Sequence, residues 1–580
     1  MIKKVWDKRA FHTFAPIGFL FGFFQVTGMD LAQSGNILWT GAYIARLLFL
    51  CVLLAVLFGG TASVVAGWTK LRGDRGGAKV KAVKLSVTDR LMKAGTIWLW
   101  LISFVLLVLS YLPFYLAYYP GICAYDTTIQ MGQVVGGSYN DHHPIAHTLL
   151  LKWSTDLGQG VFGDVNTGLA LLVLVQMLAL AAVFAGGITV LAKRGVKGPV
   201  LIGLQLFGML YPFGGYMSIS VCKDVFFTVF LLLQMLALYE MIKCKAKFGC
   251  CDVLFVISSV GMQLFRNNGR YAMLVLMAVL MLAVIVGRVN RRFWCKTALT
   301  CAVALVLGSF CISGLFKVTG AEQGDRREML SMPIQQLARC MVYHGGVGVS
   351  AQDDGTMKPE ETALINDFLL NESYKEYRPD IADPVKRHTN TYVVRYRTGD
   401  FVRTYVGLLS RYPGDFVNAA LSVNAGYLYM GDESHAYINV NGRDTGLGYV
   451  QTRFLTDELN SYGIYQDSKW ESAFDKFEKW ADTNAYLKLP VFKFLLVPGS
   501  CLWLYVLLAG WLFYRRQYDK CVPLFLVAGY YLTLFLGPTV QLRYIYPLVM
   551  ALPLIAAWTL GGRCIRDAAE SKECKNDDAE

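Results

Sequence analysis

The residues best suited to chemistry in this sequence lie in one polar stretch between two apolar segments, YYPGICAYDTTIQMGQVVGGSYNDHHPIAHTLL, residues 118–150. Its acidic residues are Asp126 and Asp141. Asp126 directly follows an apolar segment, at the boundary between membrane and water. A carboxylate at such a boundary is partly desolvated, which raises its pKa and makes it a better general base. Asp126 is therefore a candidate catalytic base, and the alternative is that it caps the helix predicted to follow it.

Three of the seven histidines fall in the same stretch, at His142, His143 and His147. His143 and His147 are four residues apart, so a helix that begins at Pro144 would place both on one face. Pro144 favours such a helix, because proline is preferred in the first turn. Together with Asp126 or Asp141, this pair could hold a divalent metal ion. The alternative is that the histidines, with Gln130, hydrogen-bond a substrate or orient Asp126.

Four basic residues lie at the predicted outer ends of apolar segments: Lys223 in SVCKD, Arg266 and Arg270 in FRNNGR, and Arg543 in QLRYIYP. Short outer loops of membrane proteins are normally poor in lysine and arginine. Cations at this depth suit a phosphate anchored in the outer leaflet, since arginine binds phosphate oxygens through paired donors. The alternative is contact with lipid headgroups, with Asp224 neutralising part of the set.

These residues must be positioned by membrane helices, because the chain is 55% hydrophobic and carries repeated apolar runs long enough to cross a bilayer. We predict about twelve transmembrane helices, at 11–29, 37–68, 94–117, 165–192, 199–217, 225–243, 252–266, 271–288, 297–316, 491–514, 521–539 and 543–561. Every second connection is basic, which places both termini in the cytoplasm and the candidate site outside.

The predicted domains are a transmembrane domain at 1–317 with its first outer loop at 118–164, an extracytoplasmic domain of mainly α content at 318–490, C-terminal transmembrane helices at 491–561, and a cytoplasmic tail at 562–580. The extracytoplasmic segment has 18 lysines and arginines against 24 aspartates and glutamates. The formal net charge of +13 therefore arises in cytoplasmic loops that face anionic lipid, and no nucleic-acid partner is expected. Within the segment, Gln336 and Arg339 of EMLSMPIQQLARC, or the loop YRPDIADPVK, could line a polar acceptor site; the alternative for both is ordinary surface structure.

The first-loop pattern YPG…YD…Q…G…HP, the KD, RNNG and RYIYP elements and the late outer domain resemble the GT-C superfamily of integral-membrane glycosyltransferases. Within it the chain looks most like the DUF6020-type bacterial membrane proteins, to which MPIQQLAR also seems similar. The resemblance implies a polyprenyl-phosphate sugar donor, a cell-envelope glycan, lipid or protein acceptor, and Asp126 as base or metal ligand. No nucleotide cofactor is expected, since the donor is already activated.

Two other functions fit parts of the sequence. A multi-pass transporter or flippase of a lipid-linked or anionic substrate would also have many spans and ionisable residues in the membrane. A non-enzymatic scaffold for envelope assembly would use the outer domain to bind a partner. The placing of the polar residues at the outer rim, away from mid-membrane, favours the glycosyltransferase.

Overall fold

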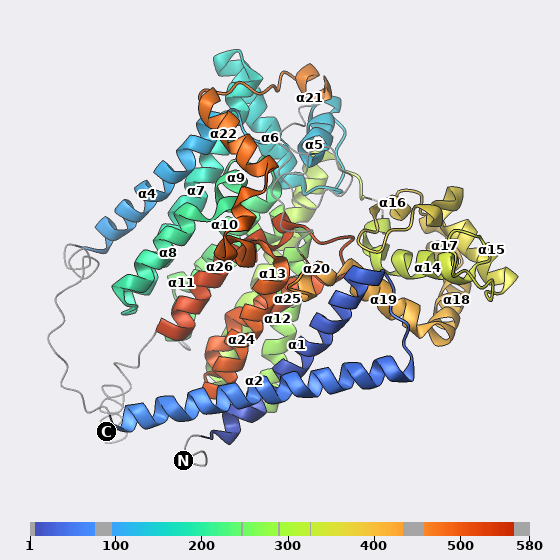
Figure 1. Cartoon of the computed structure of the whole chain (residues 1–580). Coiled ribbons are helices and arrows are strands. Elements are labelled where there is room, and N and C mark those ends of the chain that lie inside the picture. Colours follow the sequence, from blue (N-terminus) through green and yellow to red (C-terminus); the bar gives the residue numbers. More distant parts are fainter. Residues whose placement is uncertain are drawn as a thin grey trace.

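The computed structural model describes residues 6–75, 95–123, 125–244, 248–287, 290–324, 326–432 and 457–561. Regular structure in these ranges is helical, and strand pairing is limited to isolated bridges such as Ile122 with Ser220. Long helices run side by side through the body, and a smaller group of short helices lies to one side of it (Figure 1). The chain is a helical membrane protein, as its composition predicted.

Eight helices are long and apolar enough to cross a membrane among the described residues, or up to ten if each bent pair counts as one span. The eight are α1 (Lys8–Ser34), α2 (Gly41–Arg75), α4 (Thr96–Ala117), α7 (Val165–Lys193), α10 (Lys223–Cys244), α12 (Asn267–Val286), α13 (Arg291–Thr319) and α26 (Leu542–Gly561).

The two bent pairs have a common cause. Helix α8 (Gly198–Leu210) meets α9 (Pro212–Ser218) at 58°, and α23 (Pro490–Leu496) meets α24 (Pro498–Arg515) at 82°. In each pair a proline begins the second helix, and the residue before it is extended. Proline has no N–H to donate and disfavours helix at the preceding residue, so each helix must break there. The remaining predicted spans correspond to α11 (Cys250–Phe265) and α25 (Val522–Phe535), which are shorter than a typical span.

Burial separates central helices from peripheral ones. The most apolar windows of α10 and α26 are 78% buried and that of α7 is 61% buried, whereas the α2 window is only 17% buried. A helix that is apolar on all sides can be either a core helix or a lipid-facing one. Here α7, α10 and α26 form the centre, and the first turns of α10 and α26 carry part of the candidate site.

The first polar loop forms helices of its own: α5 (Tyr125–Gly136), α6 (Ile145–Leu157) and the π-helix η2 (Gly158–Phe162). The helix predicted from Pro144 is confirmed, since α6 begins directly after it. Gly158 and Gly168 let this loop approach α7 closely. A Cβ built on Gly158 would lie 2.6 Å from the Gly168 Cα atom.

The segment predicted as one outer domain, 318–490, packs in two groups. The first is a lobe at 326–423 with its own apolar core, which includes Ile334, Leu337, Phe368, Leu408 and Phe416. The helices of this lobe are η3 (Arg326–Leu330), α14 (Ser331–His344), α15 (Pro359–Phe368), η4 (Leu370–Glu376), α16 (Asp383–Lys386), α17 (Thr391–Tyr396), α18 (Thr398–Arg411) and α19 (Pro413–Val423).

The second group, α21 (Asp457–Ser461), α22 (Glu471–Asp482) and η5 (Ala485–Lys488), joins the main core. Phe477 stacks on Phe114 of α4 with ring centroids 4.2 Å apart, and the Tyr118 hydroxyl donates to Glu478 Oε1 at 2.8 Å. Helix α20 (Ala425–Leu428) links the lobe to α1 and α24. The predicted cytoplasmic tail at 562–580 lies outside the described residues.

Candidate functional site

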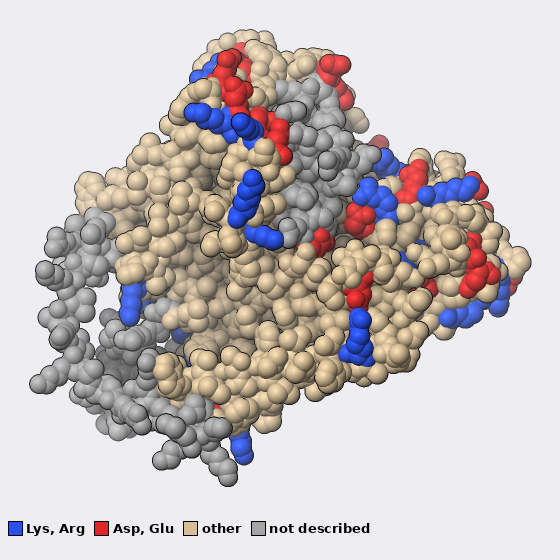
Figure 2. Space-filling model, in the orientation of Figure 1, with Lys and Arg blue, Asp and Glu red and all other residues tan. Residues whose placement is uncertain are grey.

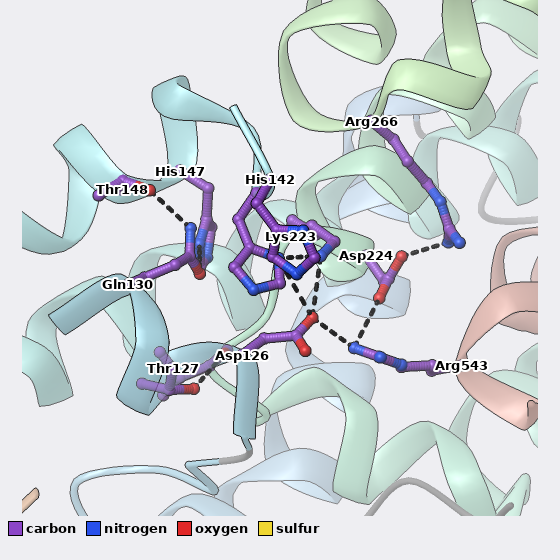
Figure 3. A network of polar contacts seen from close by, with 12 residues as sticks. Asp126, Thr127, Gln130, His142, His147, Thr148, Lys223, Asp224, Arg266 and Arg543 are labelled. Carbon is purple, nitrogen blue, oxygen red and sulfur yellow. Dashed lines mark hydrogen bonds and ion pairs between the residues drawn. The ribbon is translucent and has the colours of Figure 1, made fainter. Parts of the chain in front are cut away.

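Six of the residues singled out in the sequence meet where helix ends converge (Figure 3). Asp126 lies in the first turn of α5, Lys223 and Asp224 begin α10, and Arg543 lies in the first turn of α26. Arg266 occupies the single extended residue between α11 and α12, and His143 comes from the loop before α6. We call Asp126, His143, Lys223, Asp224, Arg266 and Arg543 the charge cluster.

Asp126 is held by two cations. Its Oδ2 accepts hydrogen bonds from Lys223 Nζ at 2.8 Å and from Arg543 Nη1 at 2.6 Å, and its side chain is buried. Burial acts to raise the pKa of this carboxyl, but the charges of Arg543 and Lys223 outweigh it and hold the pKa well below its usual value. The raised pKa expected from the sequence is therefore wrong, because the two cations were not foreseen as partners. In this arrangement Asp126 is ionised and is a weak base.

Asp224 pairs with the other side of the cluster. It is fully buried, its Oδ1 bonds Arg266 Nη1, and its Oδ2 lies 3.9 Å from Arg543 Nη1. Arg543 thus lies between two carboxylates. Of these two carboxylates, Lys223 pairs only with that of Asp126. Three cations against two carboxylates leave a net positive charge, which suits an anionic ligand.

His143 offers a hydrogen-bond donor with no partner in the described part of the chain. Its Nδ1 lies 2.9 Å from Lys223 Nζ, and an ammonium group can only donate, so Nδ1 accepts and Nε2 carries the proton. Nε2 is buried and makes no hydrogen bond with any described residue. Burial, and after it the charge of Lys223, lowers the pKa of His143 to about 2, so the ring stays neutral. A neutral imidazole with an unused N–H can bind a ligand oxygen.

A metal ion does not fit between Asp126 and His143, because the Lys223 ammonium group already lies there, 2.8 Å from the carboxylate and 2.9 Å from the ring. No group of three or more His, Cys, Asp or Glu side chains among the described residues is placed to hold one. His147 makes a different contact, with its Nδ1 2.9 Å from Gln130 Oε1.

Gln130 and His147 brace the loop that carries Asp126. Gln130 Nε2 donates to Thr148 Oγ1 at 2.8 Å, so α5 and α6 are joined through two buried side chains of α6. Thr127 Oγ1 donates to the Val221 carbonyl at 2.8 Å, which ties α5 to the chain just before Lys223. These contacts fix Asp126 relative to α10.

Three more predicted site residues form no ion pair with the charge cluster among the described residues. Asp141 accepts a hydrogen bond from the Gly324 N–H, and His142 is exposed with its ring packed against His143 at 4.5 Å. Arg270 is exposed on α12 and shares no ion pair with the charge cluster in the described residues. The four predicted phosphate-binding cations thus become three.

Gln336 and Arg339 lie in the lobe, in a separate network. Arg339 is fully buried, with Nε 2.9 Å from Asp415 Oδ1, and another of its nitrogens bonds Asn36 of the turn between α1 and α2. Gln336 bonds Tyr405 and the Phe416 carbonyl. Both side chains hold the lobe together, and Arg339 also attaches it to the turn between α1 and α2.

Sequence reasoning missed the aromatic residues around the cations. The Arg266 guanidinium lies 4.6 Å from the centroid of the Tyr544 ring and 5.7 Å from that of Tyr530, and Arg543 Nε donates to Gln541 Oε1 at 2.7 Å. The tyrosines of RYIYP were the available signal, since arginine packs on aromatic faces.

The predicted acceptor loop of the lobe reaches the same region. The Ala382 N–H donates to the Pro538 carbonyl at 2.8 Å, and Ile381 pairs with Thr539, four residues before Arg543. The lobe therefore touches the segment that leads into the charge cluster.

Comparison with known proteins identifies a family. A family model described as "Family of unknown function (DUF6020)" matches residues 136–578, which includes every residue of the charge cluster except Asp126. No curated protein and no solved structure matches the chain.

Proposed function

The chain belongs to the DUF6020 family, and we propose that it is a membrane glycosyltransferase, which moves a sugar from a polyprenyl-phosphate donor to a hydroxyl group of a cell-envelope acceptor. The observation that carries this proposal is the convergence of Asp126 with Lys223, Arg543 and the His143 N–H, which has no partner among the described residues. One buried site then holds an anion-binding pair, a carboxylate and a neutral donor. This set agrees with the GT-C resemblance of the sequence motifs.

The proposed topology has twelve spans, counting each bent pair once and including α11 and α25. The basic connections that follow α7, α10, α12 and α24 then lie in the cytoplasm with both termini, by the positive-inside rule. The charge cluster faces outside, where an activated lipid-linked sugar needs no nucleotide.

The donor phosphate would bind where Asp126 is now held. Lys223 and Arg543 both contact Asp126 Oδ2, so a phosphate oxygen that takes over these contacts releases the carboxylate. Sharing the two cations with a phosphate weakens their hold on Asp126 and raises its pKa. Donor binding thus converts a weak base into a stronger one.

In the transfer step, the acceptor oxygen attacks the anomeric carbon as Asp126 takes its proton. The bond between that carbon and the phosphate oxygen breaks, and the electron pair leaves with the polyprenyl phosphate. Lys223 and Arg543 stabilise the negative charge that develops on the leaving phosphate. The proton on Asp126 then passes to water.

His143 would orient the sugar. Its Nε2–H can donate to a sugar hydroxyl, while Lys223 fixes the ring through Nδ1. Asp224 and Arg266 do not touch the reacting atoms in this scheme. Arg266 pairs with Asp224, and Asp224 in turn helps to position the Arg543 side chain.

The test uses Asp126→Asn with the full chain reconstituted in lipid vesicles. The vesicles contain a panel of polyprenyl-phosphate hexoses and an envelope extract as acceptor, and released polyprenyl phosphate is measured by mass spectrometry. Loss of the general base should slow release by about 10²- to 10⁴-fold.

The matched control is Asp156→Asn, which makes the same change at the exposed partner of Lys152 and should leave the rate unchanged. Release by a folded Asp126→Asn protein at the wild-type rate would remove Asp126 from the mechanism. Absence of release by the wild-type protein with every donor in the panel would contradict the proposed reaction.

A further inference from the structure

Helix α18 of the lobe has a second apolar face that no described residue covers. Phe401 and Leu408 point into the lobe core, whereas Val402, Val406 and Leu409 are 51%, 54% and 40% exposed. At about 100° per residue these three side chains fall within about 60° of one another around the helix axis. They form a continuous stripe along the helix, which we call the α18 stripe.

A basic side chain borders this stripe. Arg403 lies next to Val402 on the exposed surface, and no carboxylate of a described residue forms an ion pair with it. The arginines on either side of it, Arg397 and Arg411, are paired with Asp367 and Glu361. Apolar side chains beside an unpaired cation are typical of a helix that lies in the interface of an anionic membrane.

The stripe is also continuous with the surface of the membrane helices. It ends at the corner between α18 and α19, where Gly414 lies against the Trp39 ring, and Trp39 Nε1 donates to Asn418 Oδ1 at 2.9 Å. Trp39 stands two residues before α2, whose first turns expose Ile44 and Leu48. Val417 of α19 is also exposed.

The figures agree with this placement. In Figure 1, α18 and α19 form the edge of the lobe that is nearer the start of α2. Figure 2 shows few charged side chains over α2 and a basic group at the lower edge of the lobe. Helix α2 is the span least buried by protein, so its exposed side chains face lipid.

We propose that the α18 stripe rests in the headgroup region of the membrane leaflet on the side of the charge cluster, with Arg403 against anionic phospholipid. The lobe is then held at two places, by Arg339 and Trp39 at the α1–α2 turn and by α18 on the lipid surface. The lobe contacts Pro538 and Thr539, which lie just before Arg543. The depth at which the lobe rests on the lipid therefore also sets the distance between the loop at 378–383 and the charge cluster.

The test places a photoreactive benzoylphenylalanine at single positions of the full chain, reconstituted in phosphatidylcholine vesicles with or without phosphatidylglycerol. Position 406 probes the stripe. Position 49 on α2, where Phe49 is exposed, is the lipid-facing reference, and position 360 on α15 is the lobe control, because α15 packs on another side of α18. Mass spectrometry identifies the adducts formed on illumination.

We expect lipid adducts at positions 406 and 49 and none at 360. Arg403→Glu should lower the phosphatidylglycerol adducts at 406 by about fivefold or more, because each basic residue near an anionic surface adds about this factor. Adducts at 49 without any at 406, equal adducts at 406 and 360, or cross-links from 406 to protein would each overturn the proposal. This inference does not depend on the proposed reaction, since the readout is contact with lipid.

Discussion

Replacement of Asp224 by asparagine tests whether buried ion pairs hold the charge cluster together. Asp224 is fully buried and contacts Arg266 and Arg543. Asparagine has nearly the same shape, so the change removes one charge and little packing. Three cations would then face Asp126 alone. Removing one partner of a buried ion pair costs about 3–5 kcal/mol, and we expect Asp224→Asn to lower the free energy of unfolding by that amount.

The assay is unfolding of the full chain in mixed micelles with increasing SDS, followed by helical circular dichroism. Arg266→Met completes a double-mutant cycle, because the double variant returns the cluster to its original net charge. The double variant should therefore be more stable than the sum of the single losses predicts, by about 1–3 kcal/mol.

The matched control is again Asp156→Asn. Asp156 Oδ2 lies 2.6 Å from Lys152 Nζ, but both side chains are exposed, so the loss should stay below about 1 kcal/mol. Equal losses at Asp224 and Asp156, or strict additivity of Asp224→Asn and Arg266→Met, would refute the reasoning that burial makes these pairs stabilising.

Three further predictions concern other parts of the chain. His143→Phe should slow transfer about tenfold by removing the Nε2 donor, and should lower the free energy of unfolding by about 1–3 kcal/mol, because the Lys223 ammonium group loses its Nδ1 acceptor. Because the pKa of His143 is lowered to about 2, the wild-type rate should show no titration of this residue near neutral pH. Burial acts to lower the pKa of His344, but hydrogen bonds to Asp415 and Asp354 raise it above its ordinary value. The protonated His344 ring therefore stabilises the lobe at acidic pH, and this stabilisation is lost as pH rises through the raised pKa. Amide hydrogen exchange at 340–356 should accelerate more than the intrinsic exchange rate does as pH rises through this pKa. His344→Gln should abolish this extra acceleration. Gly168→Ala should destabilise the chain by about 1–3 kcal/mol in the SDS assay, because its Cβ would meet backbone atoms of Ser154 and Gly158; alanine at Gly160, which has open space, is the control.

The sequence predicted the membrane helices because a bilayer imposes a length and a composition that can be counted along the chain. Each of the twelve predicted segments overlaps a helix or a bent pair, but only eight to ten of them are long and apolar enough to cross a membrane among the described residues. A helix begins directly after Pro144, as expected. The sequence also identified all six members of the charge cluster, since cations and carboxylates are costly at membrane depth and therefore conspicuous there.

The tertiary structure decided which charged side chains of the cluster pair with one another. Lys223 lies 97 residues from Asp126 in the sequence and Arg543 lies 417 residues away, yet both bond the same oxygen. A pKa depends on charges within a few ångströms, so the direction for Asp126 could not be read from its own neighbourhood. Arg270, only four residues after Arg266, forms none of the cluster's ion pairs among the described residues, because Arg266 is in the extended junction between α11 and α12 whereas Arg270 lies on the exposed side of the first turns of α12.

The long polar insertion shows the same division. Its composition predicted that it does not cross a membrane, because it has too few apolar residues, and its apolar spacing predicted the mainly helical structure that is observed. Only packing decided that 326–423 has its own core while 457–488 joins the membrane body. Apolar periodicity predicts that one face of a helix is buried, but the whole fold determines which surface packs against that face.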